Sequence, residues 1–368
     1  MKYYRMIEQI TIKNYKSIRK IERLPLRRIN VLIGENGAGK SNFISFFEML
    51  NAIYERRFGQ YVLQRGGIGR FFNYHAPAEE SIFCMVDFNN VNAVSLNIIP
   101  SQTGKGVISD FTHFFNGHGD KDKNYRNWND ITLDRDVEES DIQSDNSKRM
   151  SYVKKQLASF KVYHFHDTSL KSPMRGPSTM GDYEMLRSDA SNLAAWLYRV
   201  KHTDMPSFRL IEGTVKSVAP YFRKFHLEPD AINPLQIKLE WEEENSDRYL
   251  DGYSFSDGTI RFVALAALLL SEQRPDVILI DEPELGLHPA AMTKLAAMIR
   301  MASQTSQIIV STQSSAFVDE FDGEDIIVAE RSEEGSTFHR LDAVKLESWR
   351  NNYSLGELWR KNVLGGRP

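Results

Sequence analysis

The sequence is poor in cysteine and lacks long apolar runs. Cys84 is the single cysteine among 368 residues, so no disulfide can form within the chain, which suits a reducing compartment. The first five residues, Met-Lys-Tyr-Tyr-Arg, contain no hydrophobic signal core, and the longest apolar run, at residues 262–270, is too short to span a membrane. We therefore expect a cytoplasmic protein with no membrane partner.

Excess charge and internal repeats are absent as well. The formal net charge of −3 gives no overall basic footprint, so contact with nucleic acid would need a local patch or another protein. The basic residues at 13–20 and the pair Arg27-Arg28 are equally well explained as solvated surface. No sustained heptads are present, which argues against a long coiled-coil arm. The length allows one large domain or two ordinary ones.

The most informative segment that is present is a glycine-rich loop. Residues 34–41 read Gly-Glu-Asn-Gly-Ala-Gly-Lys-Ser, which fits a P-loop. Residues 29–33 read as a short buried strand and residues 42–50 as an apolar-rich helix, so the motif has the context that it needs. In a P-loop, backbone N–H groups turn inward around phosphate oxygens, and the helix N-terminus adds partial positive charge. The segment therefore predicts ATP binding.

The residues of this loop have separate expected roles. Lys40 would reach the β- and γ-phosphates, and the Ser41 hydroxyl would hold Mg²⁺. The other expected contacts to the nucleotide come from Gly34, Glu35, Asn36, Gly37, Ala38, Gly39 and Asn42. The alternative is a glycine-rich turn that binds nothing.

A second acidic motif follows a buried strand further along the chain. Residues 276–282 read Asp-Val-Ile-Leu-Ile-Asp-Glu, four aliphatic residues followed by two acids, which is a Walker B pattern. Asp281 would position Mg²⁺, directly or through water, and Glu282 would polarise the attacking water beside the γ-phosphate. The alternative is a parallel strand that ends in surface acids.

Three further segments carry a resemblance to a known group of proteins. Residues 253–261 read Tyr-Ser-Phe-Ser-Asp-Gly-Thr-Ile-Arg, residues 281–289 read Asp-Glu-Pro-Glu-Leu-Gly-Leu-His-Pro, and residues 311–314 read Ser-Thr-Gln-Ser. With the P-loop, in this order, they resemble the ABC-type ATPases of the SMC, RecF and OLD group. They are most similar to small bacterial predicted AAA/ABC ATPases, many of which belong to anti-phage defence operons. The resemblance spans residues 1 to about 321, apart from 101–159.

The resemblance implies an α/β fold of the P-loop NTPase class, an ABC-ATPase head. Its mostly parallel sheet would be flanked by helices, with an N-terminal antiparallel β lobe and a helical insertion. We expect residues 1–100 to form the first half of the head, 101–240 the insertion and helical lobe, and 241–368 the second half with signature, Walker B and switch strand. Composition predicts an exposed or partly ordered insertion at 103–148. Patterning predicts helices at 192–200 and 205–222 and strands at 160–167 and 235–241.

The resemblance also assigns roles around the signature segment. Ser256 and Gly258 of one subunit would touch the γ-phosphate bound to the other subunit, with a helix N-terminus aimed at the anion. Asp257 departs from the usual Leu-Ser-Gly-Gly-Gln and would repel phosphate unless it faces away or contacts another group. The same residues also read as an ordinary helix N-cap. Gln313 replaces the histidine of most ABC enzymes and cannot become charged, so as a catalytic residue it predicts slow turnover.

The function implied is a nucleotide-gated switch. ATP would join two heads into a homodimer or higher oligomer, and hydrolysis would separate them, regulating an effector such as a nuclease or toxin in anti-phage defence. The alternatives are a RecF-like repair ATPase that binds DNA in its ATP-bound dimer and a transporter subunit, for which the standard signature is missing. Residues 311–368 leave no room for an appended Toprim nuclease. His164 and His166 would share a face of the strand expected at 160–167, but with Asp167 as the only nearby acid a structural or nucleotide-lobe role is favoured over a metal site.

Overall fold

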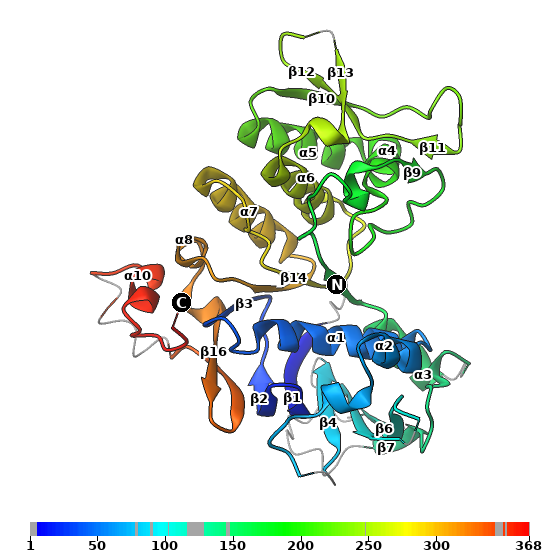
Figure 1. Cartoon of the computed structure of the whole chain (residues 1–368), viewed down its shortest axis with the longest axis vertical. Helices are drawn as coiled ribbons and strands as arrows, with labels where there is room; N and C mark the ends of the chain where they lie inside the picture. Colours follow the sequence, from blue (N-terminus) through cyan, green and yellow to red (C-terminus); the bar gives the residue numbers. More distant parts are fainter. Residues whose placement is uncertain are drawn as a thin grey trace.

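The computed structural model describes residues 6–77, 80–88, 91–101, 103–115, 129–144, 148–246, 248–342, 349 and 352–367. Figure 1 shows a sheet-rich lobe at the bottom, a helical lobe at the top, and helix α7 (Pro289–Ala302) between them. In the described part of the chain, no helix combines the length and apolarity needed to cross a bilayer.

One twelve-stranded sheet forms the framework of the lower lobe. Its order is β7-β6-β5-β4-β1-β2-β17-β16-β3-β15-β14-β8. The strands from β7 to β2 pair antiparallel, whereas β16, β3, β15, β14 and β8 are parallel neighbours. The bounds are β1 (Ile7–Tyr15), β2 (Ile18–Pro25), β3 (Ile29–Ile33), β4 (Ile82–Phe88), β5 (Asn92–Ile99), β6 (Val107–Phe115), β7 (Asn129–Asp134), β8 (Phe160–Tyr163), β14 (Val277–Asp281), β15 (Gln307–Ser311), β16 (Ile326–Ser332) and β17 (Gly335–Arg340).

Helices cover both faces of the parallel part of the sheet, which explains why its strands are nearly all apolar. Leu279 of β14 joins the core under α1 (Lys40–Tyr54), while Ile278 and Ile280 join the core on the opposite face. Helices α2 (Phe58–Gln64) and α3 (Lys148–Leu157) lie with α1, and α7, α8 (Ser315–Val318) and α10 (Leu355–Arg360) belong to the opposite face.

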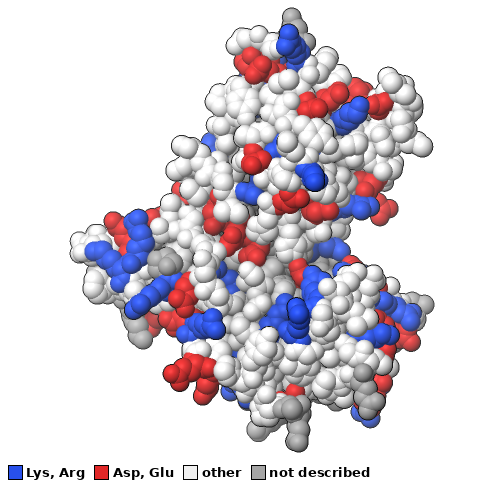
Figure 2. All heavy atoms as spheres, in the orientation of Figure 1, with Lys and Arg blue, Asp and Glu red and all other residues white. Residues whose placement is uncertain are grey.

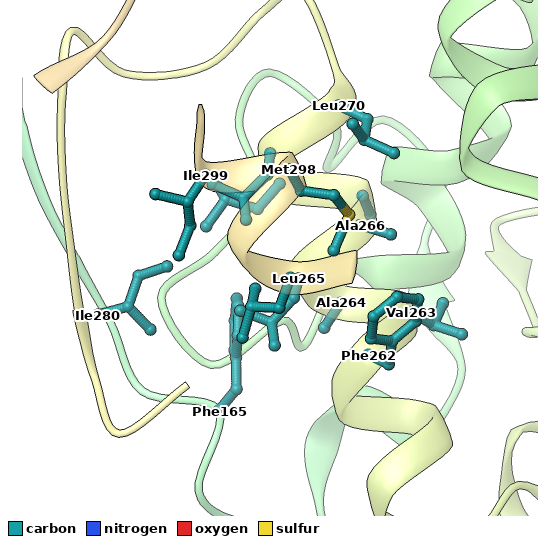
Figure 3. Close-up of a cluster of buried hydrophobic side chains, with 14 of the residues drawn as sticks. Phe165, Phe262, Val263, Ala264, Leu265, Ala266, Leu270, Ile280, Met298 and Ile299 are labelled. Carbon is teal, nitrogen blue, oxygen red and sulfur yellow. The ribbon is translucent and has the colours of Figure 1, made fainter. Parts of the chain in front are cut away.

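The helical lobe packs through α6 (Asp257–Leu270) on the core that lies on the face of the sheet opposite α1. Figure 3 shows side chains of α6 and α7, including Leu265 and Ile299, directed toward each other beside Phe165 and Ile280. The lobe also contains α4 (Leu193–Thr203), α5 (Met205–Val218), a sheet of β10 (Phe222–His226), β12 (Glu240–Glu243) and β13 (Tyr249–Asp251), and the pair β9 (Ser178–Thr179) and β11 (Gln236–Ile237). Five 3-10 helices complete the described elements: η1 (Ile68–Phe71), η2 (Ile142–Ser144), η3 (Pro173–Arg175), η4 (Gly252–Ser254) and η5 (Gly323–Asp325).

The predicted fold class, a mostly parallel sheet flanked by helices with an antiparallel β lobe, is confirmed. Three predicted elements differ. The strand expected at 160–167 ends at Tyr163, because the carbonyls of Phe165 and His166 bond to the Arg261 side chain and not to a neighbouring strand, so His164 and His166 do not lie on a strand face. The helix expected to reach residue 222 ends at Val218 because Ala219 precedes Pro220, a position that disfavours helical backbone. The single strand expected at 235–241 was wrong: β11 pairs with β9 and β12 pairs with β10, and the chain turns between them, where Glu240 N–H donates to Lys238 O.

The segment expected to be an exposed insertion or loop, 103–148, contains two strands. β6 and β7 extend the antiparallel part of the sheet, with Phe111 and Ile108 buried in its core. Antiparallel strands can expose one face to solvent, so a hydrophilic composition did not exclude strands here. Residues 116–128 and 145–147 of this segment lie outside the described residues.

Candidate functional site

The glycine-rich loop between β3 and α1 is wrapped around its own lysine. Lys40 Nζ donates hydrogen bonds to Gly34 O (2.6 Å) and Glu35 O (3.0 Å). Burial lowers the pKa of Lys40, and the carboxylates of Glu282 and Asp281 oppose that shift. The lysine therefore has carbonyl partners that a phosphate could replace, and it is held close to the acids of β14.

Two glycines of the loop are required by close backbone approaches. Gly34 has a φ of 153°, and a Cβ there would lie 2.3 Å from Ala329 O on β16. Gly39 has a φ of 101°, and a Cβ there would lie 2.4 Å from Ser336 Oγ. Any larger residue would push the loop away from β16 and β17, so both positions fit the phosphate-binding geometry that the sequence predicts.

The acids of the Walker B motif lie at the same edge of the sheet, because β3, β15 and β14 run parallel. Ser311, at the end of β15, donates its hydroxyl hydrogen to Asp281 Oδ1. Gln313 Nε2 donates to Glu282 Oε1, and Glu282 N–H donates to Ser311 O at 3.1 Å. Glu282 has a φ of 42°, a left-handed conformation that is uncommon outside glycine. The structure thus brings Asp281, Glu282 and Gln313 together.

A third acid, Glu284, bonds to the residues that follow β15, Thr312 and Gln313. It was not proposed as a site residue from the sequence. Glu284 Oε1 accepts hydrogen bonds from the Thr312 hydroxyl and from Gln313 N–H. The side chain is buried, its Oε2 has no hydrogen-bond partner among the residues that the structure describes, and burial raises the pKa of this carboxyl to about 7. Gln313 is therefore held at its backbone by Glu284 and at its side chain by Glu282. The second glutamate of the Asp-Glu-Pro-Glu motif, at residues 281–284, is the sequence feature that could have pointed to Glu284.

The predicted signature residues lie in the other lobe, at the start of α6. Ser256 Oγ accepts a hydrogen bond from Thr259 N–H (3.2 Å), so Ser256 caps the helix, and its side chain is exposed. Gly258 permits contact with the loop after β14, since a Cβ there would lie 2.6 Å from Gly286 O. Figure 1 shows α6 in the upper, helical lobe and α1, which starts at the P-loop, in the lower lobe.

The acid that departs from the usual signature is paired. Asp257 Oδ1 accepts a hydrogen bond from Arg175 Nη2 at 2.7 Å, and Arg175 is only 3 % exposed. The same guanidinium donates to Thr168 O, Gly252 O and Phe255 O. Asp257 therefore contacts another group, one of the two conditions under which its charge would be compatible with a nearby phosphate.

A second buried arginine connects this helix to the segment that follows β8. Arg261 Nε donates to Phe165 O (2.8 Å) and Arg261 Nη2 to His166 O (2.9 Å). Burial lowers the pKa of Arg261. Since β8 is the neighbour of β14 and Tyr163 pairs with Ile280, the segment held by Arg261 starts beside Asp281.

The two histidines of this segment do not form part of a metal cluster. His164 Nε2 contacts Glu48 Oε1 of α1, an interaction that raises the pKa of His164, and the His164 and His166 rings are 6.2 Å apart. Among the described residues, no group of three or more His, Cys, Asp or Glu side chains is arranged to hold a metal ion. Asp167 instead accepts a hydrogen bond from Ser169 N–H.

A Mg²⁺ ion bound together with a nucleotide needs fewer protein ligands than the groups of three or more side chains considered above. It commonly binds through one or two protein oxygen ligands together with substrate phosphates and waters. The Ser41 hydroxyl, exposed in the first turn of α1, and the Asp281 carboxylate, at the end of β14, offer such oxygens. Ser41 and Asp281 are therefore the residues that would hold Mg²⁺ when a nucleotide is bound.

A cavity of about 480 Å³ adjoins the loop on the side of the antiparallel lobe. Its walls come from the β1–β2 turn, the start of α1, the segment around Tyr74 and the β16–β17 hairpin; they include Lys16, Ser17, Asn42, Arg70, Tyr74 and Arg331. The predicted residue Asn42 lies here, and its Nδ2 donates to Ser17 Oγ at 2.8 Å. Gly37, another predicted residue, also lines the cavity. The remaining lining residues were not predicted, because they come from segments outside the P-loop motif.

Comparisons with known proteins agree with this geometry. A family model described as "AAA ATPase domain" matches residues 6–91. One similar solved structure is the SmcHead bound to the C-winged helix domain of ScpA: TM-score 0.62, 16 % identity, covering 93 % of this chain and 99 % of that one. A second is an Smc head domain with an extended coiled coil bound to the C-terminal domain of ScpA, from Pyrococcus furiosus: TM-score 0.58, 15 % identity, covering 94 % and 99 %. Comparison with curated proteins gives no match.

At these identities the solved structures establish the fold alone, which is that of an SMC-type ATPase head. Together with the matches to AAA family models, this fold confirms the predicted relation to the ABC-type ATPases of the SMC group. A second family model matches residues 115–319, which is more than half of the chain. The chain therefore belongs to the family described as "AAA domain, putative AbiEii toxin, Type IV TA system".

Proposed function

We propose that this protein binds and hydrolyses Mg-ATP at the edge of the sheet formed by β3, β15 and β14, and that ATP joins two copies. The observation that carries the proposal is the convergence of Lys40, Asp281, Glu282 and Gln313 at this edge, with Gln313 bonded to Glu282. The cavity beside Lys16 and Tyr74 is large enough to receive the nucleoside part.

The residues have distinct tasks in this proposal. Lys40 exchanges its carbonyl partners for β- and γ-phosphate oxygens, and Ser41 and Asp281 hold Mg²⁺. Glu282 accepts a proton from the attacking water, and the Gln313 amide keeps Glu282 and the water in place. Because Gln313 stays neutral, it stabilises the transition state less than an imidazolium would, and turnover is slow.

Joining of two copies is supported by the position of the signature helix. Ser256 and Gly258 are at the start of α6 in the upper lobe (Figure 1), where Ser256 is exposed and Gly258 is half-buried. A second copy could present this helix start to the γ-phosphate, where the partial positive charge of the N-terminus is favourable. The Arg175 contact keeps the Asp257 charge partly neutralised in such an arrangement.

The work of the switch is proposed to be done on a partner, a nuclease or toxin in bacterial anti-phage defence. The family description, with its reference to a toxin system, supports an effector of this kind. The SMC heads with this fold were solved with ScpA bound, an example of such a head with a protein partner. Figure 2 shows acidic and basic side chains mixed over the visible face, so this face offers no continuous basic surface in support of the RecF-like alternative.

The decisive experiment is the mass of wild type and Glu282→Gln by light scattering, with and without Mg-ATP. The substitution removes the base and keeps the size of the side chain, so ATP should stay bound and hold two copies together. We expect a dimer or larger species only for Glu282→Gln with ATP. Rapid hydrolysis by Glu282→Gln, or a mass that never responds to ATP, would contradict the proposal.

A further inference from the structure

The segment at residues 354–367, here called the C-terminal clasp, lies against the P-loop. It starts with a capping box, in which Ser354 and Glu357 bond to each other's backbone N–H groups (2.9 and 3.2 Å), and continues as α10. Leu358 and Trp359 are fully buried, and Leu364 joins the same core. The clasp is thus a packed part of the fold.

The clasp approaches the P-loop through a pair of glycines. Gly365 and Gly366 have φ values of 79° and 56°, and a Cβ on Gly366 would lie 2.7 Å from Val328 Cγ1 and 3.3 Å from Gly34 Cα. Gly366 N–H donates to Glu330 Oε1 at 3.0 Å, and the indole N–H of Trp359 donates to Gly366 O. The backbone at Gly366 is therefore fixed directly against the first residue of the P-loop.

The other end of the clasp holds the helix that follows Gln313. Gly356 N–H donates to Asp319 Oδ1 at 2.6 Å, and a Cβ on Gly356 would lie 2.2 Å from Ser315 O in α8. The clasp thus connects the two segments that would face the γ-phosphate, the P-loop and the residues after β15. A residue placed at the Gly366 end is positioned relative to both.

That residue is Arg367. Its side chain is exposed, and within the described residues its guanidinium has no hydrogen bond or ion pair. Its backbone neighbour is fixed against Gly34, so a long side chain at this position can reach an anion in the P-loop. Guanidinium groups bind phosphate oxygens through paired N–H donors, even at exposed positions.

We propose that Arg367 binds a phosphate oxygen of the nucleotide in the P-loop of its own chain, and so is a further nucleotide-binding residue. This inference rests on the proposed ATP binding. The clasp serves as the support that holds Arg367 at the loop, in the way that α1 holds Lys40.

The test is the affinity of Arg367→Ala for a non-hydrolysable ATP analogue with Mg²⁺ and for adenosine, by titration calorimetry. We expect the affinity for the ATP analogue to fall about threefold to tenfold, as for one partly exposed charged contact, and adenosine to bind as to wild type. Arg360→Ala, which removes an exposed arginine from α10 of the same clasp, is the matched control and should change neither affinity.

A second variant keeps Arg367 and changes the position of the backbone that precedes it. Gly366→Ala places a methyl group against Val328 and Gly34, so it should weaken ATP-analogue binding, and Arg367→Ala should then have no additional effect. Unchanged ATP-analogue affinity of Arg367→Ala, or an equal loss for adenosine, would overturn the inference. Failure of wild type to bind the ATP analogue would instead overturn the proposed function, so the two outcomes are distinguishable.

Discussion

The edge of the sheet and the start of α6 differ in how their polar groups are satisfied. At the edge, Lys40, Asp281 and Glu282 all bond to other residues of the same chain, and they lie together. At the start of α6, Ser256 is exposed and its hydroxyl bonds only within its own first turn. In the proposed function, the first region holds the groups that act on a nucleotide, and the second is the surface that a second copy would present to that nucleotide.

The largest expected effect on the rate of ATP hydrolysis comes from removing Lys40. Lys40→Ala should lower ATP hydrolysis about a thousandfold, because a buried charge aimed at the phosphates is lost. Steady-state phosphate release measures the rate. Lys161→Ala, which removes a cation paired with Glu55 on the same lobe, should stay within about twofold of wild type.

Mixing two inactive variants sharpens the comparison. Ser256→Arg blocks the signature surface and leaves the P-loop intact, whereas Lys40→Ala does the reverse. If sites form between copies, an equal mixture should recover roughly a quarter of the wild-type rate, since half of the dimers are mixed and each has one complete site. No recovery, or full activity of Ser256→Arg alone, would show that the start of α6 does not complete a site in another copy.

The next effect concerns the arginine that neutralises Asp257. Arg175→Ala removes a buried guanidinium with five hydrogen-bonded partners and should lower the free energy of unfolding by about 4 kcal/mol. Urea denaturation followed by circular dichroism measures this. Arg187→Ala removes an exposed arginine paired with Asp182 and should cost no more than about 0.5 kcal/mol. Equal effects of the two variants would mean that Arg175 does not organise the start of α6.

The smallest effect is a dependence on pH. Burial raises the pKa of Glu284 to about 7, so the folded state holds this proton more tightly than the unfolded state. The stabilisation from this proton is complete below the ordinary value of 4.5 and is lost as pH rises through 7. Relative to Glu284→Gln, wild type should lose on the order of 2 to 3 kcal/mol of unfolding free energy between pH 4.5 and 8. Glu228→Gln, at an exposed pair, is the control, and a parallel pH profile for Glu284→Gln would contradict the prediction.

The sequence predicted the residues that act through local patterns and missed those that act across the fold. The P-loop and Walker B motifs each lie in one short segment between a strand and a helix, and parallel strands necessarily bring their ends together. Asp257 was identified, but its partner Arg175 is 82 positions away and no local pattern connects them. The roles of Gly366 and Arg367 depend on packing against Gly34, far away in the sequence. The roles predicted for Lys40, Glu282, Gln313, Ser256 and Gly258 remain predictions about chemistry, although their positions are now defined.

The position of β3 in the sheet has a consequence for the order of folding. β3 precedes the P-loop, yet both of its neighbours come from much later in the chain: Ile29 pairs beside Ile308 of β15, and Val31 beside Ile326 of β16. During synthesis from the N-terminus, β3 therefore has no strand to pair with until residues 307–332 have left the ribosome. Pairing over such a separation is slow, because a long loop must close before its contacts form. A nascent chain thus carries the complete glycine-rich motif without the pairing that shapes it until β15 and β16 have been made, and we expect no nucleotide binding before that point.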